Sequence, residues 1–220
     1  MPDPDDLLLP LDAIVFDNDG VLCDSDASVS RSWAAWARPR GLDPDEVTVY
    51  AHGQRSVETV IHYCPPEERE AAAAEIERLE LEDAAHVTPI PGALALTASV
   101  PRDRWGVVTS GSVALSGARL AAAGFPRPPF VVTADEVQNG KPDPEGYLKA
   151  IARLGVPAAH VAVLEDSPAG IRAAAGAGAG TIIGVGAGAV PTEATLVVRD
   201  LTALTWTGEG LLVRGAGRLR

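Results

Sequence analysis

Short apolar runs rich in valine and isoleucine recur along the chain, and polar residues follow most of them. Runs that are apolar at every position over this length are typical of strands buried on both faces of a parallel sheet. They lie at residues 13–16, 105–108, 130–133, 161–164 and 181–185, with a sixth candidate at 195–198. From about residue 90 onward, helical segments separate the runs. This alternation predicts an α/β fold with a Rossmann-like, doubly wound parallel sheet.

Two of the intervening segments carry a clear helix-start signal. Asp143-Pro144 and Ser167-Pro168 each place a capping side chain directly before a proline. Proline is favoured at the first helical position, where a backbone N–H has no partner. The pattern predicts helices that begin at Pro144 and Pro168, and Ser112 is expected to cap the helix that follows it.

The interval from 24 to 88 is different, because it contains helical segments and no strand between them. The segments read "SRSWAAWARPRG", "SVETVIHY" and "PPEEREAAAAEIERLELEDAAH". We expect a small helical cap domain at 24–88, inserted into an α/β catalytic core made of residues 1–23 and 89–220. The stretch "VTPIPGA" would be the return linker. Trp33 and Trp36 share one helix face, which indicates packing rather than stacking on a ligand.

Composition and charge narrow the class of partner. The 220 residues carry 30 acidic and 18 basic side chains, a net charge of −12. Such a chain is a poor match for nucleic acid or an anionic membrane surface. Its two cysteines, Cys23 and Cys64, match no metal-ligand spacing, and neither a secretory signal nor a long apolar span is visible. We therefore expect a cytoplasmic protein; the sequence does not indicate an oligomeric state.

Polar side chains follow four of the predicted strands. Ligands of open α/β sheets bind outside the carboxyl ends of the strands, so these residues should converge. They are Asp17 and Asp19; Thr109, Ser110 and Gly111; Lys141; and Glu165 and Asp166.

This collection suits one kind of chemistry. Carboxylates without histidine or cysteine are the hard oxygen ligands that Mg²⁺ prefers. A lysine and a hydroxyl beside free backbone amides bind phosphate. Asp17 and Asp19, at positions i and i+2, point to the same face of an extended segment. One carboxylate can attack phosphorus while a second exchanges protons with the leaving group and water.

Four segments resemble the four motifs of the haloacid dehalogenase-like phosphohydrolases, in the right order. They are "FDNDGVLCDSD", "VVTSGS", "GKPDPEGYL" and "LEDSPAGI", and the likeness spans residues 13 to 188. Within that superfamily the chain is similar to the sugar- and polyol-phosphate phosphatases with a small helical cap, the glycerol-3-phosphatase and 2-deoxyglucose-6-phosphatase group. The segments "AHGQRSVETV" and "VTADEVQNGKPDPEGYLKA" carry this closer likeness.

The resemblance implies a role for each motif. Asp17 would be the nucleophile and Asp19 the general acid and base, with an aspartyl-phosphate intermediate. Phosphate would be bound by the loop Thr109, Ser110 and Gly111 and by Lys141. Mg²⁺ would be held by Asp17, the backbone carbonyl of Asp19, and Asp166, while direct coordination by Glu165 and a place in the outer shell both stay open. The cap segment His52, Gly53, Gln54 and Arg55 would close over a small phosphorylated sugar or polyol.

Other interpretations remain to be weighed. A phosphomutase would use a histidine or lysine early in the cap, which this chain lacks, and a haloacid dehalogenase has no use for Asp19. A phospho-aspartate signalling receiver places its acidic pair before the acceptor, in about half this length. A silent binding domain is disfavoured because every motif residue is present. Among the cap residues, Arg55 could instead form a structural ion pair, and His52 could be structural.

Overall fold

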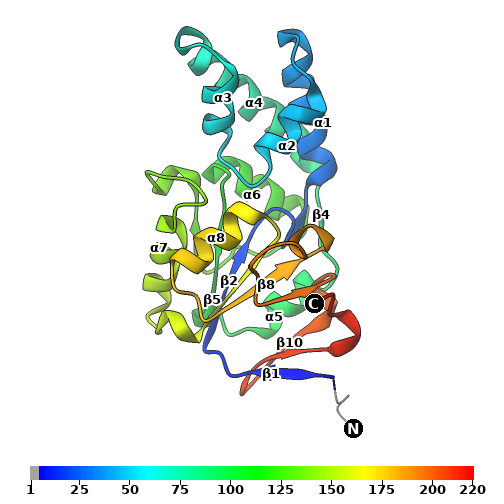
Figure 1. Ribbon diagram of the computed structural model, residues 1–220, viewed down its shortest axis with the longest axis vertical. Helices are drawn as coiled ribbons and strands as arrows, with labels where there is room; N and C mark the ends of the chain where they lie inside the picture. Colours follow the sequence, from blue (N-terminus) through cyan, green and yellow to red (C-terminus); the bar gives the residue numbers. More distant parts are fainter. Residues whose placement is uncertain (1–4) are drawn as a thin grey trace.

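A computed structural model describes residues 5–220 of the chain, and its centre is a six-stranded parallel sheet (Figure 1). The strand order is β6-β5-β2-β7-β8-β9. The strands are β2 (Ala13–Asp17), β5 (Trp105–Val108), β6 (Val131–Val132), β7 (Val161–Glu165), β8 (Thr181–Val185) and β9 (Leu196–Val198). Every residue of β2, β5, β7 and β8 is buried, and all of them are apolar except Thr181 and the carboxylates that end β2 and β7, Asp17 and Glu165. The predicted α/β fold with a parallel sheet is confirmed.

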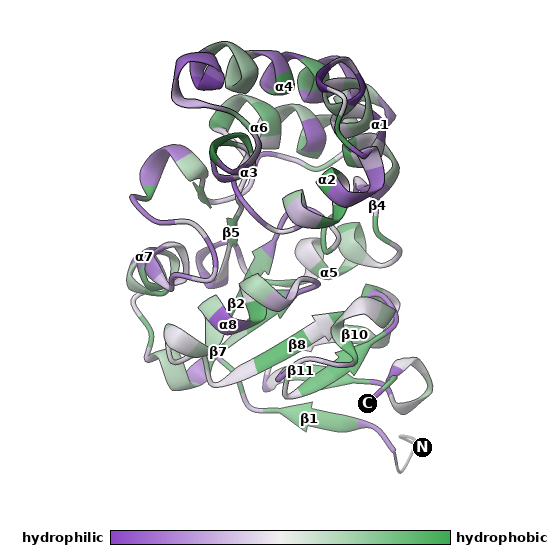
Figure 2. Cartoon of the chain, turned by 45° about the horizontal axis from the view of Figure 1, so that its top comes forward, coloured by the Kyte–Doolittle hydropathy of each residue, from purple (hydrophilic) through white to green (hydrophobic). Residues whose placement is uncertain are grey.

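Helices cover both faces of this sheet, and alternate strand residues supply the two apolar layers. Ile14 and Phe16 point into one layer, with residues of α5 (Ala93–Ser99) and α6 (Val113–Ala122). Val15 points into the other, with α7 (Glu145–Leu154) and α8 (Pro168–Gly176). This is the two-residue period of a strand that is buried on both sides. Figure 2 shows the apolar residues running along β2 and β8 between these layers.

Two helix starts agree with the sequence and one differs. Ser112 caps α6 by accepting a hydrogen bond from the Leu115 amide, and Ser167 caps α8 with Pro168 in the first turn. The start predicted at Pro144 is wrong by one residue, because α7 begins at Glu145. The Asp143 carboxylate still accepts a hydrogen bond from the Glu145 amide, at 2.9 Å, in the turn before the helix.

Four helices lie together beyond the carboxyl ends of the strands (Figure 1). They are α1 (Asp26–Ala37), α2 (Pro44–Ala51), α3 (Ser56–Tyr63) and α4 (Arg69–Asp83), and they share an apolar cluster of their own. Trp33 and Trp36 pack edge to face inside that cluster. Helix α2 was missed in the sequence although Asp43-Pro44 carries the same start signal: the Asp43 carboxylate accepts hydrogen bonds from two amides of the first turn. We refer to these four helices as the helical insert.

The helical insert is joined to the sheet by two short strands. β3 (Cys23–Asp24) and β4 (Thr88–Pro89) pair antiparallel, so the outgoing and returning chains run side by side. The expected division at residues 24 and 88 falls within this pair, and as a domain boundary it stays a prediction. The stretch that begins at Val87 is therefore partly a strand rather than only a linker.

A small antiparallel sheet at the opposite end of the molecule was not predicted. Its order is β1-β11-β10, from β1 (Leu7–Leu9), β10 (Leu204–Thr207) and β11 (Gly210–Val213). Leu204, Leu211 and Val213 join the apolar layer on the α5 side of the main sheet. The sheet pairs β1, near the start of the described chain, with two strands near its end, on the side of the molecule away from the helical insert (Figure 1). No helix within residues 5–220 combines the length and the hydropathy that a membrane span needs.

Candidate active site

Asp17, Lys141 and Glu165 meet at the carboxyl ends of β2 and β7. Each is less than a tenth exposed. The Lys141 ammonium donates a hydrogen bond to Oδ1 of Asp17 at 2.6 Å and another, very short, to Oε1 of Glu165. Asp17 and Glu165 end neighbouring parallel strands at one edge of the sheet. Lys141 lies in the loop before α7 and reaches both carboxylates, although it is 124 positions from Asp17 in sequence. The lysine fixes the rotation of the Asp17 carboxylate.

Glu165 is the anchor of this arrangement, because both of its oxygens accept several hydrogen bonds. Besides Lys141, Oε1 accepts one from the Tyr147 hydroxyl at 2.9 Å. Oε2 accepts from the amides of Asp166 and Ser167, each at 2.9 Å, and from the Ser167 hydroxyl at 3.0 Å. A Cβ added to Gly170 would lie 1.7 Å from Oε1, so α8 can pass this carboxylate only with glycine there.

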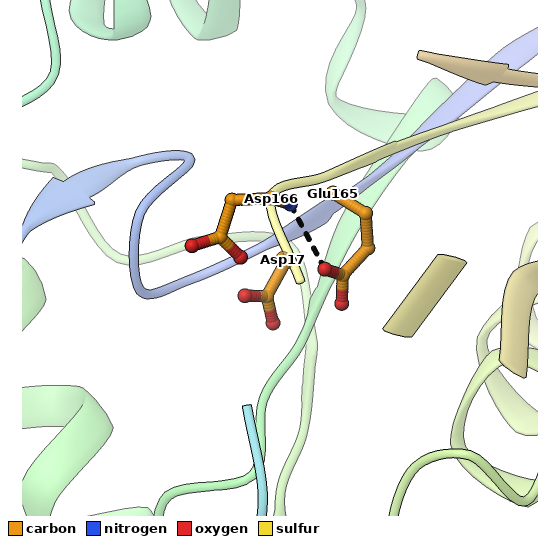
Figure 3. Close-up of side chains that lie close together, drawn as sticks. All are labelled: Asp17, Glu165 and Asp166. Carbon is orange, nitrogen blue, oxygen red and sulfur yellow. Dashed lines mark hydrogen bonds between the residues drawn. The ribbon is translucent and has the colours of Figure 1, made fainter. Parts of the chain in front are cut away.

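Asp17, Glu165 and Asp166 form a compact acidic cluster (Figure 3). Each offers an oxygen, and these atoms lie within 4.8 Å of one another. Among residues 5–220, neither histidine nor cysteine belongs to this group, and an all-carboxylate donor set fits a hard divalent cation such as Mg²⁺. Gly20, at φ +75°, passes directly beneath: a Cβ there would lie 2.0 Å from Oδ2 of Asp166.

Burial and mutual repulsion set the charges of the cluster. Burial, together with the nearby Glu165 and Asp19, raises the pKa of Asp17 to about 8, although Lys141 opposes the shift. The pKa of Asp166 is also raised well above its ordinary value, first by burial and then by Glu165 and Asp17. Burial disfavours the Lys141 cation, yet Asp17 and Glu165 outweigh it and raise its pKa. The site has more negative charge than one lysine balances, and a bound cation would restore the ionised forms.

Asp19 turns away from the cluster toward the helical insert. Its Oδ1 accepts hydrogen bonds from the Ser25 hydroxyl at 2.7 Å and from Nη1 of Arg119 at 2.9 Å. Its Oδ2 accepts one from Nδ2 of Asn18 at 3.1 Å. The Asp19 side chain therefore lies outside the carboxylate group that could ligate a metal, and a role for its backbone carbonyl stays a prediction.

The loop after β5 supplies hydroxyls and amides close to Lys141. Oγ1 of Thr109 accepts a hydrogen bond from the Gly111 amide at 3.0 Å, which curls the loop. The Ser110 hydroxyl donates to the backbone carbonyl of Gly53, at 3.0 Å, and so is engaged by the helical insert. Ser110 and Gly111 both line the cavity described next.

A cavity of about 650 Å³ lies between the sheet edge and the helical insert. Asp17, Asp19, Lys141 and Asp166 line its floor, and His52, Gly53 and Gln54 line it from the insert. Nε2 of His52 is 3.5 Å from Oδ2 of Asp166. The Gln54 amide donates to the Tyr50 carbonyl at 2.8 Å. The predicted cap segment therefore faces the strand-end carboxylates in three of its four positions.

Arg55 is the exception among the predicted cap residues. Its guanidinium forms an ion pair with Glu58, at 2.6 Å, and donates to the backbone carbonyl of Gln138 at 3.1 Å. It lies outside the residues that line the large cavity and instead bridges α3 to the loop that leads to Lys141. The structural ion pair considered in the sequence analysis is what the structure contains.

Sequence reasoning missed a buried charged pair beside this cavity, Arg119 and Glu80. Each is 3% exposed, and Nη2 of Arg119 donates to Oε1 of Glu80 at 3.0 Å. A signal was present: Glu80 follows the buried Ala72 and Ile76 at four-residue intervals on α4, and Arg119 lies four residues after the buried Leu115 on α6. A charge on the core-facing stripe of an amphipathic helix is seldom left there without a partner.

Known proteins resemble this chain in sequence and in fold. The model of the haloacid dehalogenase-like hydrolase family matches residues 11–178, more than half of the chain. Hexitol phosphatase A of Escherichia coli is 39% identical over 204 residues, 88% of this chain and 93% of that protein. Glycerol-1-phosphate phosphohydrolase 2 of Saccharomyces cerevisiae is 30% identical over 191 residues, 81% and 76% of the two chains. A hydrolase from Pseudomonas syringae has the same fold, with a TM-score of 0.77 at 22% identity, over 86% of this chain and 94% of that one.

The parallel sheet and its strand-end carboxylates, with these matches, define a hydrolytic enzyme with a doubly wound α/β core. The chain belongs to the haloacid dehalogenase-like hydrolases.

Proposed function

We propose that the protein is a Mg²⁺-dependent phosphatase that hydrolyses a small sugar or polyol phosphate through an aspartyl-phosphate on Asp17. The observation that carries this proposal is the Asp17 carboxylate, buried at a strand end and held by Lys141 within an acidic cluster at the floor of the cavity. A buried carboxylate beside a lysine and a cation site can attack phosphorus, because the two positive charges offset the negative charge of the phosphoryl group.

The residues at the floor of the cavity would bind two different groups, Mg²⁺ and the phosphoryl oxygens. Asp17, Asp166 and the backbone carbonyl of Asp19 would hold Mg²⁺, which when bound supplies positive charge to the phosphoryl oxygens. The Glu165 oxygens accept hydrogen bonds from Lys141, Tyr147 and the start of α8, so the role of Glu165 is to position the lysine. Lys141 and the loop Thr109 to Gly111 would bind the remaining phosphoryl oxygens.

Asp17 would attack phosphorus as the ester bond to the leaving alcohol breaks, and Asp19 would give that alcohol its proton. Water would then attack the aspartyl-phosphate, with Asp19 taking a proton from it. This releases inorganic phosphate and restores both carboxyl groups to their starting states. Proton transfer of this kind contributes about 10²- to 10⁴-fold to a rate.

The cavity favours a hydroxyl-bearing leaving group. Besides the floor, its wall includes Ser30, Thr48, Gln54, Ser56 and Asp26. Hydroxyls, an amide and carboxylates complement the hydroxyls of a polyol. Two relatives with long matches act on polyol phosphates by name, a hexitol phosphatase and a glycerol-1-phosphate phosphohydrolase, which supports the same substrate class here.

The test is phosphate release from a panel of polyol, sugar and nucleotide monophosphates, with Mg²⁺ and with EDTA, for the wild type and Asp17→Asn. We expect Mg²⁺-dependent release that is strongest on polyol or sugar phosphates and lost in Asp17→Asn. Movement of phosphate within one sugar without net release would make the protein a mutase. Stable labelling of Asp17 by acetyl phosphate, with no release from any ester, would favour a signalling or binding role and overturn the proposal.

A further inference from the structure

Arg119 connects the proposed proton donor to the helical insert. Its side chain is 4% exposed and lies on α6, within the core. Nη1 donates to Oδ1 of Asp19 at 2.9 Å, while Nη2 donates to Oε1 of Glu80 at 3.0 Å. Asp19 belongs to the loop after β2, whereas Glu80 belongs to α4 of the insert. One guanidinium therefore bridges the α/β core and the helical insert.

The bridge is built for arginine. A buried cation needs anionic partners, because removing it from water is costly unless its charge is paired. The planar guanidinium presents its donors in a fixed fork, so it can face two carboxylates in different directions at once. Lysine has one freely rotating ammonium and would not hold both carboxylates in fixed directions.

Glu80 is itself held within the insert. It is 3% exposed, and its Oε2 accepts a hydrogen bond from the Ser56 hydroxyl at 3.2 Å. Ser56 opens α3, directly after the loop 52–55 that reaches the cavity. The position of Arg119 is thus set from the insert, by way of α3 and α4, and not only from the core.

The contacts of Asp19 show what the bridge accomplishes. Arg119 and Ser25 both donate to Oδ1, and this occupies that oxygen and fixes the rotation of the carboxylate. Oδ2 has only the longer contact from Asn18, at 3.1 Å. Oδ2 is then the oxygen that is left to exchange a proton with the leaving alcohol.

We propose that Arg119 is a positioning residue that orients Asp19 for proton transfer, and that Glu80 holds Arg119 in place from the insert. The inference rests on the proposed function, since it needs Asp19 to act on a leaving group. It adds that the position of the helical insert and the orientation of the Asp19 carboxylate are coupled through Arg119. Displacing Arg119 would slow the cleavage of an ester whose leaving alcohol needs a proton from Asp19. It would not slow the cleavage of an ester whose leaving group needs none.

The test compares two substrates that differ in this need. Sorbitol-6-phosphate has a poor leaving group, so breaking its ester requires a proton from Asp19. p-Nitrophenyl phosphate has a good leaving group, and its burst of p-nitrophenol reports phosphorylation of Asp17 alone. For Arg119→Ala we expect kcat on sorbitol-6-phosphate to fall about 100-fold with little change in KM, while the burst rate changes less than about threefold.

Further variants keep the test decisive if Arg119→Ala does not fold. Arg119→Lys retains charge without the fork, and Glu80→Gln retains shape while weakening the hold on Arg119, so both should show the same selective loss. The double variant Arg119→Lys with Glu80→Gln should be little worse than Arg119→Lys alone, because the two residues act through one contact. Arg78→Ala is the matched control, since that arginine pairs with Glu82 on the exposed face of α4.

A burst rate on p-nitrophenyl phosphate that falls as much as kcat on sorbitol-6-phosphate, or a change confined to KM, would overturn the inference and assign Arg119 to folding or to substrate binding. These outcomes differ from failure of the proposed function, in which the wild type itself would release phosphate from neither substrate.

Discussion

Removing divalent metal should make the stability of the protein depend on pH in an unusual direction. Most buried carboxylates in proteins are paired and stabilise the fold more as pH rises. Here burial raises the pKa of Asp17 from its ordinary 3.8 to about 8, so the folded protein without metal holds this proton more tightly than the unfolded chain does. The favourable contribution is complete below the unfolded pKa and is lost as pH rises toward about 8.

The size of the effect follows from the shift. One pKa unit corresponds to about 1.36 kcal/mol, so moving from about pH 5 to about pH 8 should lower the free energy of unfolding by about 4 kcal/mol through Asp17 alone. Asp166, whose pKa is also raised, acts in the same direction. The raised pKa of Lys141 adds nothing in this window, because lysine is protonated in both states.

Urea unfolding followed by tryptophan fluorescence measures this dependence. We expect wild type in EDTA to lose stability between about pH 5 and about pH 8, while Asp17→Asn in EDTA, which cannot ionise there, keeps a much flatter profile. Saturating Mg²⁺ should restore stability most at the higher pH, since metal ligands must be deprotonated; at about 100 times Kd the gain is about 2.7 kcal/mol. Stability in EDTA that is flat or rises with pH in the wild type would refute the reasoning.

Three further substitutions test separate contacts. Lys141→Met leaves Asp17 and Glu165 buried without their cation and should lower the free energy of unfolding in EDTA by about 3–5 kcal/mol; a loss under about 1 kcal/mol in urea titrations would contradict the pairing. Gly20→Ala places a Cβ 2.0 Å from Asp166 and should raise the Mg²⁺ concentration for half-maximal phosphate release at least tenfold; an unchanged metal requirement would show that the loop can shift. Gly53→Ala puts a side chain at φ +76°, 2.7 Å from the Ser167 hydroxyl, so we expect the free energy of unfolding to fall by about 1–3 kcal/mol and KM to rise. Calorimetry and steady-state kinetics equal to those of wild type would show that this loop does not pack closely against Ser167.

The parts of the fold that could be predicted are those with a local pattern. Strands β2 and β7 are buried on both faces, so their residues are apolar up to the last position, and the acidic residues at that position, Asp17 and Glu165, mark the sheet edge. Because parallel strands end at one edge, the meeting of Asp17 with Lys141 could be expected from sequence. Helix α2 was missed although Asp43-Pro44 marks its start, since its eight residues carry only two buried positions, Val47 and Ala51.

What could not be predicted depends on contacts between distant segments. The sheet of β1, β10 and β11 pairs segments that are about 200 residues apart in sequence, and nothing in the leucines at 7–9 specifies the partner. Arg119 and Glu80 are 39 residues apart, and only the packing of α4 against α6 brings them together. The sequence left two roles open for Arg55, a substrate contact and a structural ion pair, and the structure shows its guanidinium paired with Glu58, three residues further along the chain.

The central claim is that Asp17 accepts the phosphoryl group. Acid quenching during turnover of a polyol phosphate, followed by peptide mass spectrometry, would locate the intermediate. The account predicts a phosphorylated peptide with the modification on Asp17, seen with Mg²⁺ and absent with EDTA. Phosphate on another residue, or turnover at full rate in Asp17→Asn, would contradict it.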